Sequence, residues 1–272
     1  MPPYPRIAIV TPSLNQAPFL EGCLCSVFDQ QYPGLEYLVM DGGSVDGSVE
    51  IIRRYSDRLA FWRSAPDAGQ SAAINEGFDR STGDIMGWLN SDDRLAPGAL
   101  QTVVSFFAEH PECEWLAGAG EMVSPKGKPL GRTTPGPMDF DALVDWDRHP
   151  LFQPAVFWRR SLWQRAGGLD ADLHCSMDLD LWLRFARQTQ GAAIPQVLAF
   201  ATSHRRTKTR RLAAEMLAET CLVLARHGAL AQARHKLARP IRRAFELDRR
   251  LAPLTRNPLY RRWRERHERP AP

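Results

Sequence analysis

Two adjacent carboxylates, Asp92 and Asp93, follow a short apolar run at residues 85–89. The run predicts a buried strand, and the polar residues after it predict a turn at its carboxyl end. Two acids at the mouth of an α/β sheet repel each other and lose hydration, and a divalent cation such as Mg²⁺ or Mn²⁺ would compensate for both effects. The alternative is that Asp92 caps the following helix and Asp93 is solvated. Taken alone, the pair leaves both interpretations open.

Two further acids follow predicted strands in the same way, Asp41 and Asp67. Because the carboxyl ends of parallel strands meet at one edge of a sheet, these acids should converge with Asp92 and Asp93 on one crevice. A carboxylate at Asp41 can accept hydrogen bonds from a base imide or a ribose hydroxyl. The glycine-rich segment 41–48 lacks the G-x-G-x-x-G spacing of a dinucleotide site, so by itself it also fits a tight turn.

Strand and helix patterns alternate in the first hundred residues, which predicts βαβ units around a parallel sheet. Segment 124–137, with four prolines and three glycines, predicts a hairpin or a mobile loop. The predicted strands are residues 6–10, 35–40, 61–64, 85–89 and 155–158, and the predicted helices are 18–28, 49–55, 71–78, 100–107, 161–166 and 177–186.

The chain has 272 residues and a formal net charge of +4, but the charge is unevenly distributed. Residues 205–272 hold 19 Lys and Arg against 6 Asp and Glu, whereas residues 1–204 hold 16 against 25. This asymmetry predicts an acidic α/β domain at 1–204 and a basic extension at 205–272. The five scattered cysteines, the lack of a signal-like N-terminus and the lack of a long apolar run lead us to expect a cytoplasmic protein.

Seven motifs in a fixed order give this chain a specific resemblance. They are residues 11–16, 41–48, 66–71, 83–93, 153–160, 167–170 and 177–184. Together they resemble the family 2 glycosyltransferases, nucleotide-sugar-dependent inverting enzymes of the GT-A fold, over roughly residues 6 to 204. The resemblance implies a Rossmann-like, mostly parallel central sheet flanked by helices, here with a C-terminal helical extension.

The resemblance also implies roles for particular residues. Asp92 and Asp93 match the family's D-x-D-type element, which holds Mn²⁺ or Mg²⁺ on the donor diphosphate, and His204 stands where relatives often supply a histidine to the metal. Asp178 matches the second acid of the family's E-D pair, the catalytic base. Residues implied to bind the nucleotide sugar are Thr11, Ser13, Asn15, Asp41, Gly42, Asp67, Gln70, Asn75, Asn90, Ser91 and Asp92.

Three positions depart from the family pattern. Asn90 replaces the first acid of a full D-x-D, Met177 replaces the first acid of the E-D pair, and Ala68 stands where many relatives have lysine. The expected activity is transfer of a sugar, with UDP as the first nucleotide to consider, to a glycan or a lipid-linked acceptor. The departures keep an alternative open, a non-catalytic nucleotide-sugar-binding or scaffold protein of the same fold.

The basic extension predicts helices at 212–226, 230–237 and 241–251. Its arginines and aromatic residues favour peripheral binding to an anionic membrane surface at the inner face of the membrane. The alternative is a helical cap that packs on the acidic domain. We expect no nucleic-acid partner, because no recognised nucleic-acid motif is present. Trp88, Trp158 and Trp182 are predicted to pack in the core, and Trp146 and His149 to line an acceptor groove.

Overall fold

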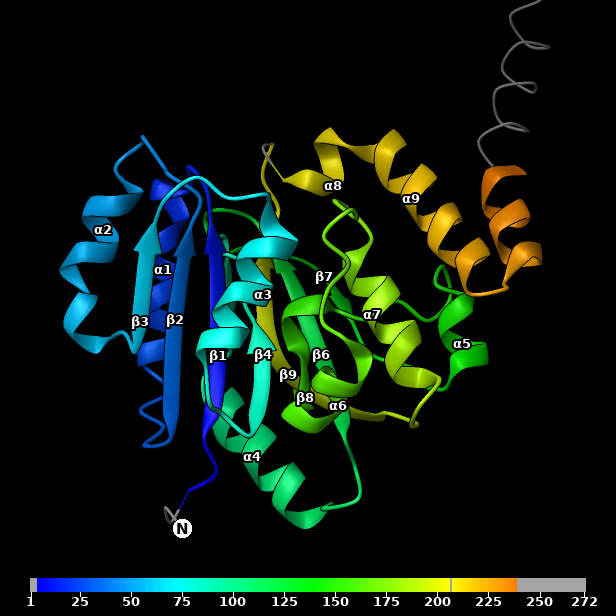
Figure 1. Ribbon diagram of the computed structural model, residues 1–272, viewed down its shortest axis with the longest axis horizontal. Helices are drawn as coiled ribbons and strands as arrows, with labels where there is room; N and C mark the ends of the chain where they lie inside the picture. The colour runs from blue at the N-terminus through cyan, green and yellow to red at the C-terminus, as the bar shows by residue number, and fades with distance from the viewer. Residues whose placement is uncertain (1–3, 206, 239–272) are drawn as a thin grey trace, which may run out of the picture.

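The computed structural model describes residues 4–205 and 207–238, and it places a nine-stranded sheet between two layers of helices (Figure 1). The strand order is β3-β2-β1-β4-β8-β6-β9-β5, and β7 pairs with β6 outside this path. The strands are β1 (Ile7–Ser13), β2 (Leu35–Asp41), β3 (Phe61–Ser64), β4 (Ile85–Trp88), β5 (Asp93–Leu95), β6 (Trp115–Val123), β7 (Pro129–Thr133), β8 (Val156–Arg159) and β9 (Ala192–Thr202). The helices of four or more residues are α1 (Ala17–Phe28), α2 (Ser48–Arg54), α3 (Gln70–Arg80), α4 (Ala99–Glu109), α5 (Phe140–Val144), α6 (Arg160–Ala166), α7 (Met177–Ala186), α8 (Lys208–Arg211) and α9 (Ala213–Arg226), and residues 230–238 are also helical.

The first half of the sheet is parallel, as the alternation of strands and helices predicts. β3, β2, β1 and β4 pair in parallel, and the register places Ser13 beside Asp41 and Asp41 beside Ser64. The predicted α/β architecture is therefore confirmed. It also follows that the carboxyl ends of these strands lie at one level.

The second half of the sheet is mixed, with antiparallel pairs β4–β8, β6–β8 and β5–β9 beside the parallel pair β6–β9. The sequence patterns did not predict β5, β6 or β9 as strands. At 124–137 the structure has the predicted hairpin, because β7 pairs with β6 in antiparallel orientation. In β6 the strand signal is weakened by Gly118 and Gly120. The Phe152 ring packs directly on Gly120, where an added Cβ would stand 1.8 Å from a ring carbon. Close packing requires glycine at this point, and glycine weakens the sequence signal of a strand.

The two faces of the sheet carry separate hydrophobic clusters. Alternate residues of β1 contribute to each, Val10 on the side of α3, α6 and α7, and Ile9 on the side of α1 and α4. Trp88, Trp158 and Trp182 are buried in the first cluster, and the indole rings of Trp88 and Trp182 stack with centroids 5.7 Å apart. The prediction that these tryptophans form core is confirmed.

The described part of the extension packs against the rest of the molecule. α9 lies beside α7 in Figure 1, and Cys221, Val223 and Leu224 belong to the same core cluster as the tryptophans. The predicted helices at 212–226 and 230–237 are confirmed within one or two residues. The predicted helix at 241–251 and the arginine-rich end lie outside the described residues. Among the helices of the two described ranges, none has the length and apolar character of a membrane span.

A buried ion cluster ties the end of α9 to α7, and it gives a stability prediction. The Asp180 carboxylate accepts hydrogen bonds from Arg184 Nε at 2.8 Å and pairs with His227 Nε2 at 3.0 Å. Burial alone would raise the pKa of Asp180, but the hydrogen bond with His227 and the charge of Arg184 outweigh burial and lower it. Asp180→Ala should lower the free energy of unfolding by about 3 kcal/mol at neutral pH, because Arg184 and His227 both lose their buried hydrogen-bond partner.

Because the folded-state pKa of Asp180 lies below its unfolded value, this contribution is present at neutral pH and is lost as the pH falls below about 4. Urea denaturation at pH 7 and pH 3.5 measures the difference. Asp172→Ala, an exposed carboxyl on the preceding loop, is the matched control and should change little. Equal loss of stability in both variants would contradict the role given to the cluster.

Candidate active site at the carboxyl edge of the sheet

The loop after β2 is folded around the Asp41 carboxylate. Asp41 Oδ2 accepts hydrogen bonds from the backbone N–H groups of Gly43 at 3.1 Å and Ser44 at 2.8 Å, and from Ser64 Oγ at 2.7 Å. Asp41 Oδ1 accepts from Ser44 Oγ at 2.5 Å. The side chain is fully buried, so in this structure Asp41 shapes the loop. Its predicted contact with a nucleotide stays a prediction.

The loop after β1 is tied to the same segment. Asn15 has a positive φ of 53°, and its Oδ1 accepts from the backbone N–H of Val45 at 3.0 Å. Its own N–H donates to Ser44 Oγ at 2.7 Å. Asparagine tolerates this left-handed backbone better than most residues because its short side chain can hydrogen-bond locally. Asn15 therefore ties the loop after β1 to the loop after β2.

Asp67 converges with Asp41 as the topology predicts. Its Oδ2 lies where a Cβ on Gly42 would approach to 3.1 Å, so the absence of a side chain at Gly42 lets the two loops meet. Asp67 Oδ1 accepts from the N–H of Gly69 at 2.9 Å, and Arg63 Nη2 lies 3.8 Å from Oδ2. The acidic loops after β2 and β3 thus share one cationic neighbour.

The hydroxyls at the end of β1 point in different directions. Thr11 Oγ1 is completely buried and lies 3.0 Å from the Tyr37 hydroxyl, inside the core. Ser13 Oγ is also buried, and it has no hydrogen-bond partner within residues 4–205 and 207–238. A buried hydroxyl of this kind calls for a ligand atom or a water molecule. The predicted nucleotide contacts of Thr11 and Ser13 stay predictions.

Asn90 is hydrogen-bonded to three polar side chains, one of which belongs to the acid pair. Asn90 Oδ1 accepts from Gln70 Nε2 at 2.7 Å, and Asn90 Nδ2 donates to Asp93 Oδ2 at 3.1 Å and to Gln153 Oε1 at 2.9 Å. Gln153 in turn donates to the Trp88 carbonyl at 3.0 Å. An amide at position 90 can donate and accept at once, which a carboxylate at the same position could not.

Asp92 and Asp93 face different surroundings. Asp93 begins β5, is 5% exposed, and is opposite Ala201 in the antiparallel ladder with β9. Burial, followed by the charge of Asp92, raises the pKa of Asp93 well above its usual range, although the hydrogen bond from Asn90 acts in the opposite direction. The Asp92 side chain is 18% exposed and lies 3.0 Å from His204 Nε2.

His204 is brought to Asp92 by the β5–β9 ladder, since it follows β9 by two residues. Its ring stacks on Phe19 of α1 with centroids 4.3 Å apart, which fixes the ring plane. In the part of the chain that the structure describes, no three His, Cys, Asp or Glu side chains form a group that could hold a metal ion. The pair nevertheless fits a metal shared with a ligand, because cis ligands with metal bonds of roughly 2.1 Å stand about 3 Å apart. Mg²⁺ and similar ions commonly take one or two protein ligands and complete their shell with phosphates and water.

Asp178 occupies the first turn of α7. Its Oδ1 accepts from the N–H of Leu179 at 2.8 Å. Burial raises the pKa of Asp178 to about 6, although the backbone hydrogen bonds and the charge of Lys208 act in the opposite direction. A carboxylate with a pKa in this range can accept a proton near neutral pH, which is what a general base requires.

Lys208 links the two halves of the site. Its ammonium donates to Gln70 Oε1 at 2.6 Å and to the carbonyl of His174 at 2.6 Å. Gln70 bonds to Asn90, so Lys208 joins the acid-pair network on one side and the loop before Asp178 on the other. Residues 205–211 contain five Lys and Arg, and among those that the structure describes it is Lys208 that makes these two contacts.

The remaining predicted residues have mainly internal partners. The amide of Asn75 donates to the Leu169 carbonyl and accepts from the Leu169 N–H, each at 2.9 Å, and so anchors the loop that begins at Gly167 and Gly168. Ser91 is 3% exposed. Trp146 packs against the core cluster. Ligand contacts of all three stay predictions, as does the acceptor groove at Trp146 and His149.

Three residues entered the site without being predicted. Gln153 supports Asn90, Ser64 supports Asp41, and Glu219 holds the loop before α7. Gln153 lies in one of the seven motifs, which was an available signal. Ser64 follows from the register of β2 and β3. Glu219 lies on an amphipathic helix among ordinary surface residues, and nothing in the sequence pattern distinguishes it.

Comparison with known proteins places this geometry in a family. The model of the family described as glycosyl transferase family 2 matches residues 8–160. An uncharacterised glycosyltransferase of Mycobacterium tuberculosis is 31% identical over 199 residues, which cover 71% of this chain and 74% of the relative.

Two solved structures share the fold. Staphylococcus aureus TarS 1–349 in complex with UDP-GlcNAc superposes with a TM-score of 0.67 at 15% identity, covering 85% of this chain and 72% of that one. The mannosyltransferase PcManGT of Pyrobaculum calidifontis, in complex with GDP-Man and Mn²⁺, gives a TM-score of 0.61 at 22% identity, covering 96% and 83%. With its parallel half-sheet, its converging acidic loops and the match over 8–160, this chain belongs to glycosyl transferase family 2 and is an enzyme of that family.

Proposed function

We propose that this enzyme transfers a sugar from a nucleotide-diphosphate donor to an acceptor hydroxyl with inversion at the anomeric carbon, and that Asp178 is the base. The observation that carries the proposal is the hydrogen-bonded path from Asp93 through Asn90, Gln70 and Lys208 to the loop before Asp178. It connects an acid pair suited to a metal and a diphosphate with a carboxyl suited to take a proton. A UDP-sugar is the donor to test first, because TarS was solved with UDP-GlcNAc and with UDP.

In the proposed reaction the acceptor oxygen attacks the anomeric carbon as the bond from that carbon to the diphosphate breaks. The acceptor proton passes to Asp178, and the nucleoside diphosphate leaves on the opposite face, so that one displacement inverts the centre. The acceptor hydroxyl is a weak nucleophile, and removing its proton in the transition state is worth about 10²- to 10⁴-fold in rate. Burial raises the pKa of Asp178 to about 6. At pH 7 most of the carboxyl is therefore ionised, and it can accept a proton.

Asp92 and His204 are the residues that would hold Mn²⁺ or Mg²⁺, which when bound neutralises charge on the leaving diphosphate. Asp93 supports them by fixing Asn90. Lys208 supplies a second positive charge near the donor. It would take the place of the lysine that many relatives have where this chain has Ala68. Ser13 Oγ is available to the nucleotide from the end of β1.

The acceptor that we propose is a glycan or a lipid-linked sugar. The proposal that the basic extension binds an anionic membrane surface rests on its composition, 19 Lys and Arg in 68 residues. A cytoplasmic location at the inner face of a membrane would place the enzyme beside a lipid-linked acceptor.

Calorimetric titration with UDP, GDP and dTDP, each with and without Mn²⁺, tests the donor site. We expect one nucleotide to bind at least about tenfold more tightly with Mn²⁺ than without it. The reason is that one ion would be coordinated both by the phosphates of the nucleotide and by side chains of the protein. Asp57→Ala, an exposed carboxyl at the far end of α2, is the control and should bind as wild type does. If no nucleotide binds under either condition, the proposed donor chemistry is wrong.

A further inference from the structure

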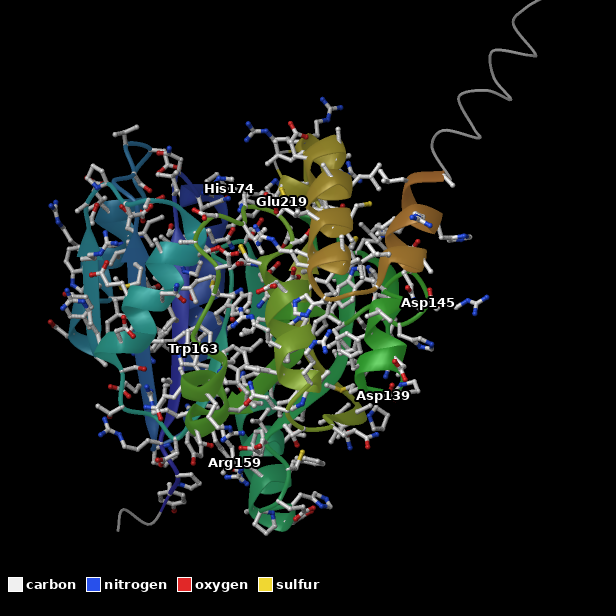
Figure 2. The ribbon with its side chains drawn as sticks, turned by 45° about the vertical axis from the view of Figure 1, so that its right-hand side comes forward. Asp139, Asp145, Arg159, Trp163, His174 and Glu219 are labelled. Atoms are coloured by element: carbon white, nitrogen blue, oxygen red, sulfur yellow. The ribbon has the colours of Figure 1, made fainter. Side chains whose placement is uncertain are left out.

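Glu219 of α9 holds the three backbone N–H groups that immediately precede α7. Its Oε1 accepts from His174 N at 2.9 Å, and its Oε2 accepts from Cys175 N at 2.6 Å and Ser176 N at 3.0 Å. Figure 2 shows Glu219 and His174 next to each other, where α9 passes over the loop. The contact joins positions 43 to 45 residues apart in the chain.

This contact replaces a local helix cap. Ser176 is the N-cap residue of α7, but its side chain makes no capping hydrogen bond. Its hydroxyl lies instead 3.0 Å from Thr220 Oγ1, the residue after Glu219. A serine at this position normally accepts from the first turn of its own helix. Here the start of α7 is fixed from α9, by two consecutive residues of the extension.

The same loop is held from the other side by Lys208, which donates to the carbonyl of His174. Asp178 follows Ser176 by two residues, so the position of this loop sets the position of the Asp178 carboxyl. The charged groups that face Asp178 are Lys208 from α8 and Glu219 from α9, with the Cys175 thiol nearby.

We propose that Glu219 is a positioning residue for the base: by binding the N–H groups of residues 174–176 it sets the place of the Asp178 carboxyl. The extension is thereby part of the catalytic apparatus. This inference rests on the proposed role of Asp178 as the base.

The electrostatics give the inference a measurable signature. Burial alone would raise the pKa of Glu219, but its three backbone hydrogen bonds outweigh burial and lower it, so Glu219 is ionised at neutral pH. Its negative charge raises the pKa of Asp178, and Lys208 lowers it. Glu219→Gln removes the charge that opposes ionisation of Asp178, so the pKa of Asp178 must fall. A residue that only stabilised the fold would not move this pKa.

Three variants and two readouts test the inference. Glu219→Gln should lower kcat by roughly tenfold, since small displacements of a reacting group are costly. It should also shift the acidic limb of the pH–rate profile to lower pH and leave the donor KM within about twofold. Glu219→Asp keeps the charge and shortens the reach, so kcat should fall while the acidic limb stays in place. Glu215→Gln, one turn earlier on α9 and exposed, is the matched control and should behave as wild type.

Amide hydrogen exchange gives a readout that is independent of turnover. Exchange at His174, Cys175 and Ser176 should quicken in both Glu219 variants and stay unchanged in the Glu215 variant. Wild-type kcat, acidic limb and exchange in Glu219→Gln would overturn the inference, provided that Asp178→Asn is inactive. If Asp178→Asn keeps full activity, the proposed base itself is wrong, which is a separate result.

Discussion

Asp178→Asn is expected to lower kcat by about 10²- to 10⁴-fold while leaving the affinity for the donor nucleotide within about threefold of wild type. The amide has nearly the shape of the carboxyl, but it cannot accept the acceptor's proton, so the loss falls on the chemical step. The Asp178 carboxyl accepts from the Leu179 N–H of its own helix, whereas the nucleotide is proposed to bind the loops after β1, β2 and β3. The measurement is steady-state kinetics with calorimetry of the nucleotide on the same preparation.

The pH profile sharpens this test. In wild type, kcat should fall tenfold per pH unit below about 6, because burial raises the pKa of Asp178 to about 6 and its protonated form cannot act as a base. The residual rate of Asp178→Asn should show no such limb. Burial destabilises the ionised carboxyl in the folded protein, and this cost is present above pH 6 and disappears below the unfolded value of 3.8. The neutral amide should therefore raise Tm at pH 7.

Asp172→Asn, on the exposed loop before α7, is the control and should match wild type in kcat, pH profile and Tm. A variant Asp178→Asn with a wild-type acidic limb would mean that another group titrates there. Such a result would remove Asp178 from the mechanism even if kcat were reduced.

The second large effect is expected from Asp92→Asn, which should weaken nucleotide binding in Mn²⁺ by at least roughly 100-fold, or about 2.8 kcal/mol. Asp92 is the partly exposed member of the acid pair and faces His204 at 3.0 Å, so it is one of only two side chains proposed to meet the ion. Without Mn²⁺ the variant and wild type should bind the nucleotide alike. Titration of Mn²⁺ at fixed nucleotide concentration measures the difference.

Asp93→Asn is the matched variant, one residue along the chain with the same replacement of a carboxyl by an amide. Asp93 is buried and accepts from Asn90, and an amide oxygen can still accept that hydrogen bond. We therefore expect a smaller loss of Mn²⁺-dependent binding than in Asp92→Asn. The reverse order would show that Asp93 is the principal ligand, and the assignment of roles within the pair would have to be exchanged.

The first half of the fold was predictable because its signals are local. The strands β1, β2 and β4 are largely apolar runs followed by polar residues, and helices separate the runs. The second half was not predictable in this way. In β6, Gly120 accommodates the Phe152 ring and Gly118 accommodates the Leu198 side chain, and β9 contains Pro195. These residues interrupt the pattern of a strand.

Residue types and their spacing were enough to identify the available chemistry: paired acids after β4, acidic loops after β2 and β3, and a carboxyl at the start of α7. They were enough to indicate the family as well, because seven motifs occur in order. The surroundings of each group depend on the folded chain. The β5–β9 ladder turns Asp92 toward His204 and buries Asp93, and α9 brings Glu219 to the loop before Asp178. These outcomes depend on contacts between residues more than 40 positions apart, and burial and neighbouring charge then set the pKa of each carboxyl, which residue type and spacing cannot specify.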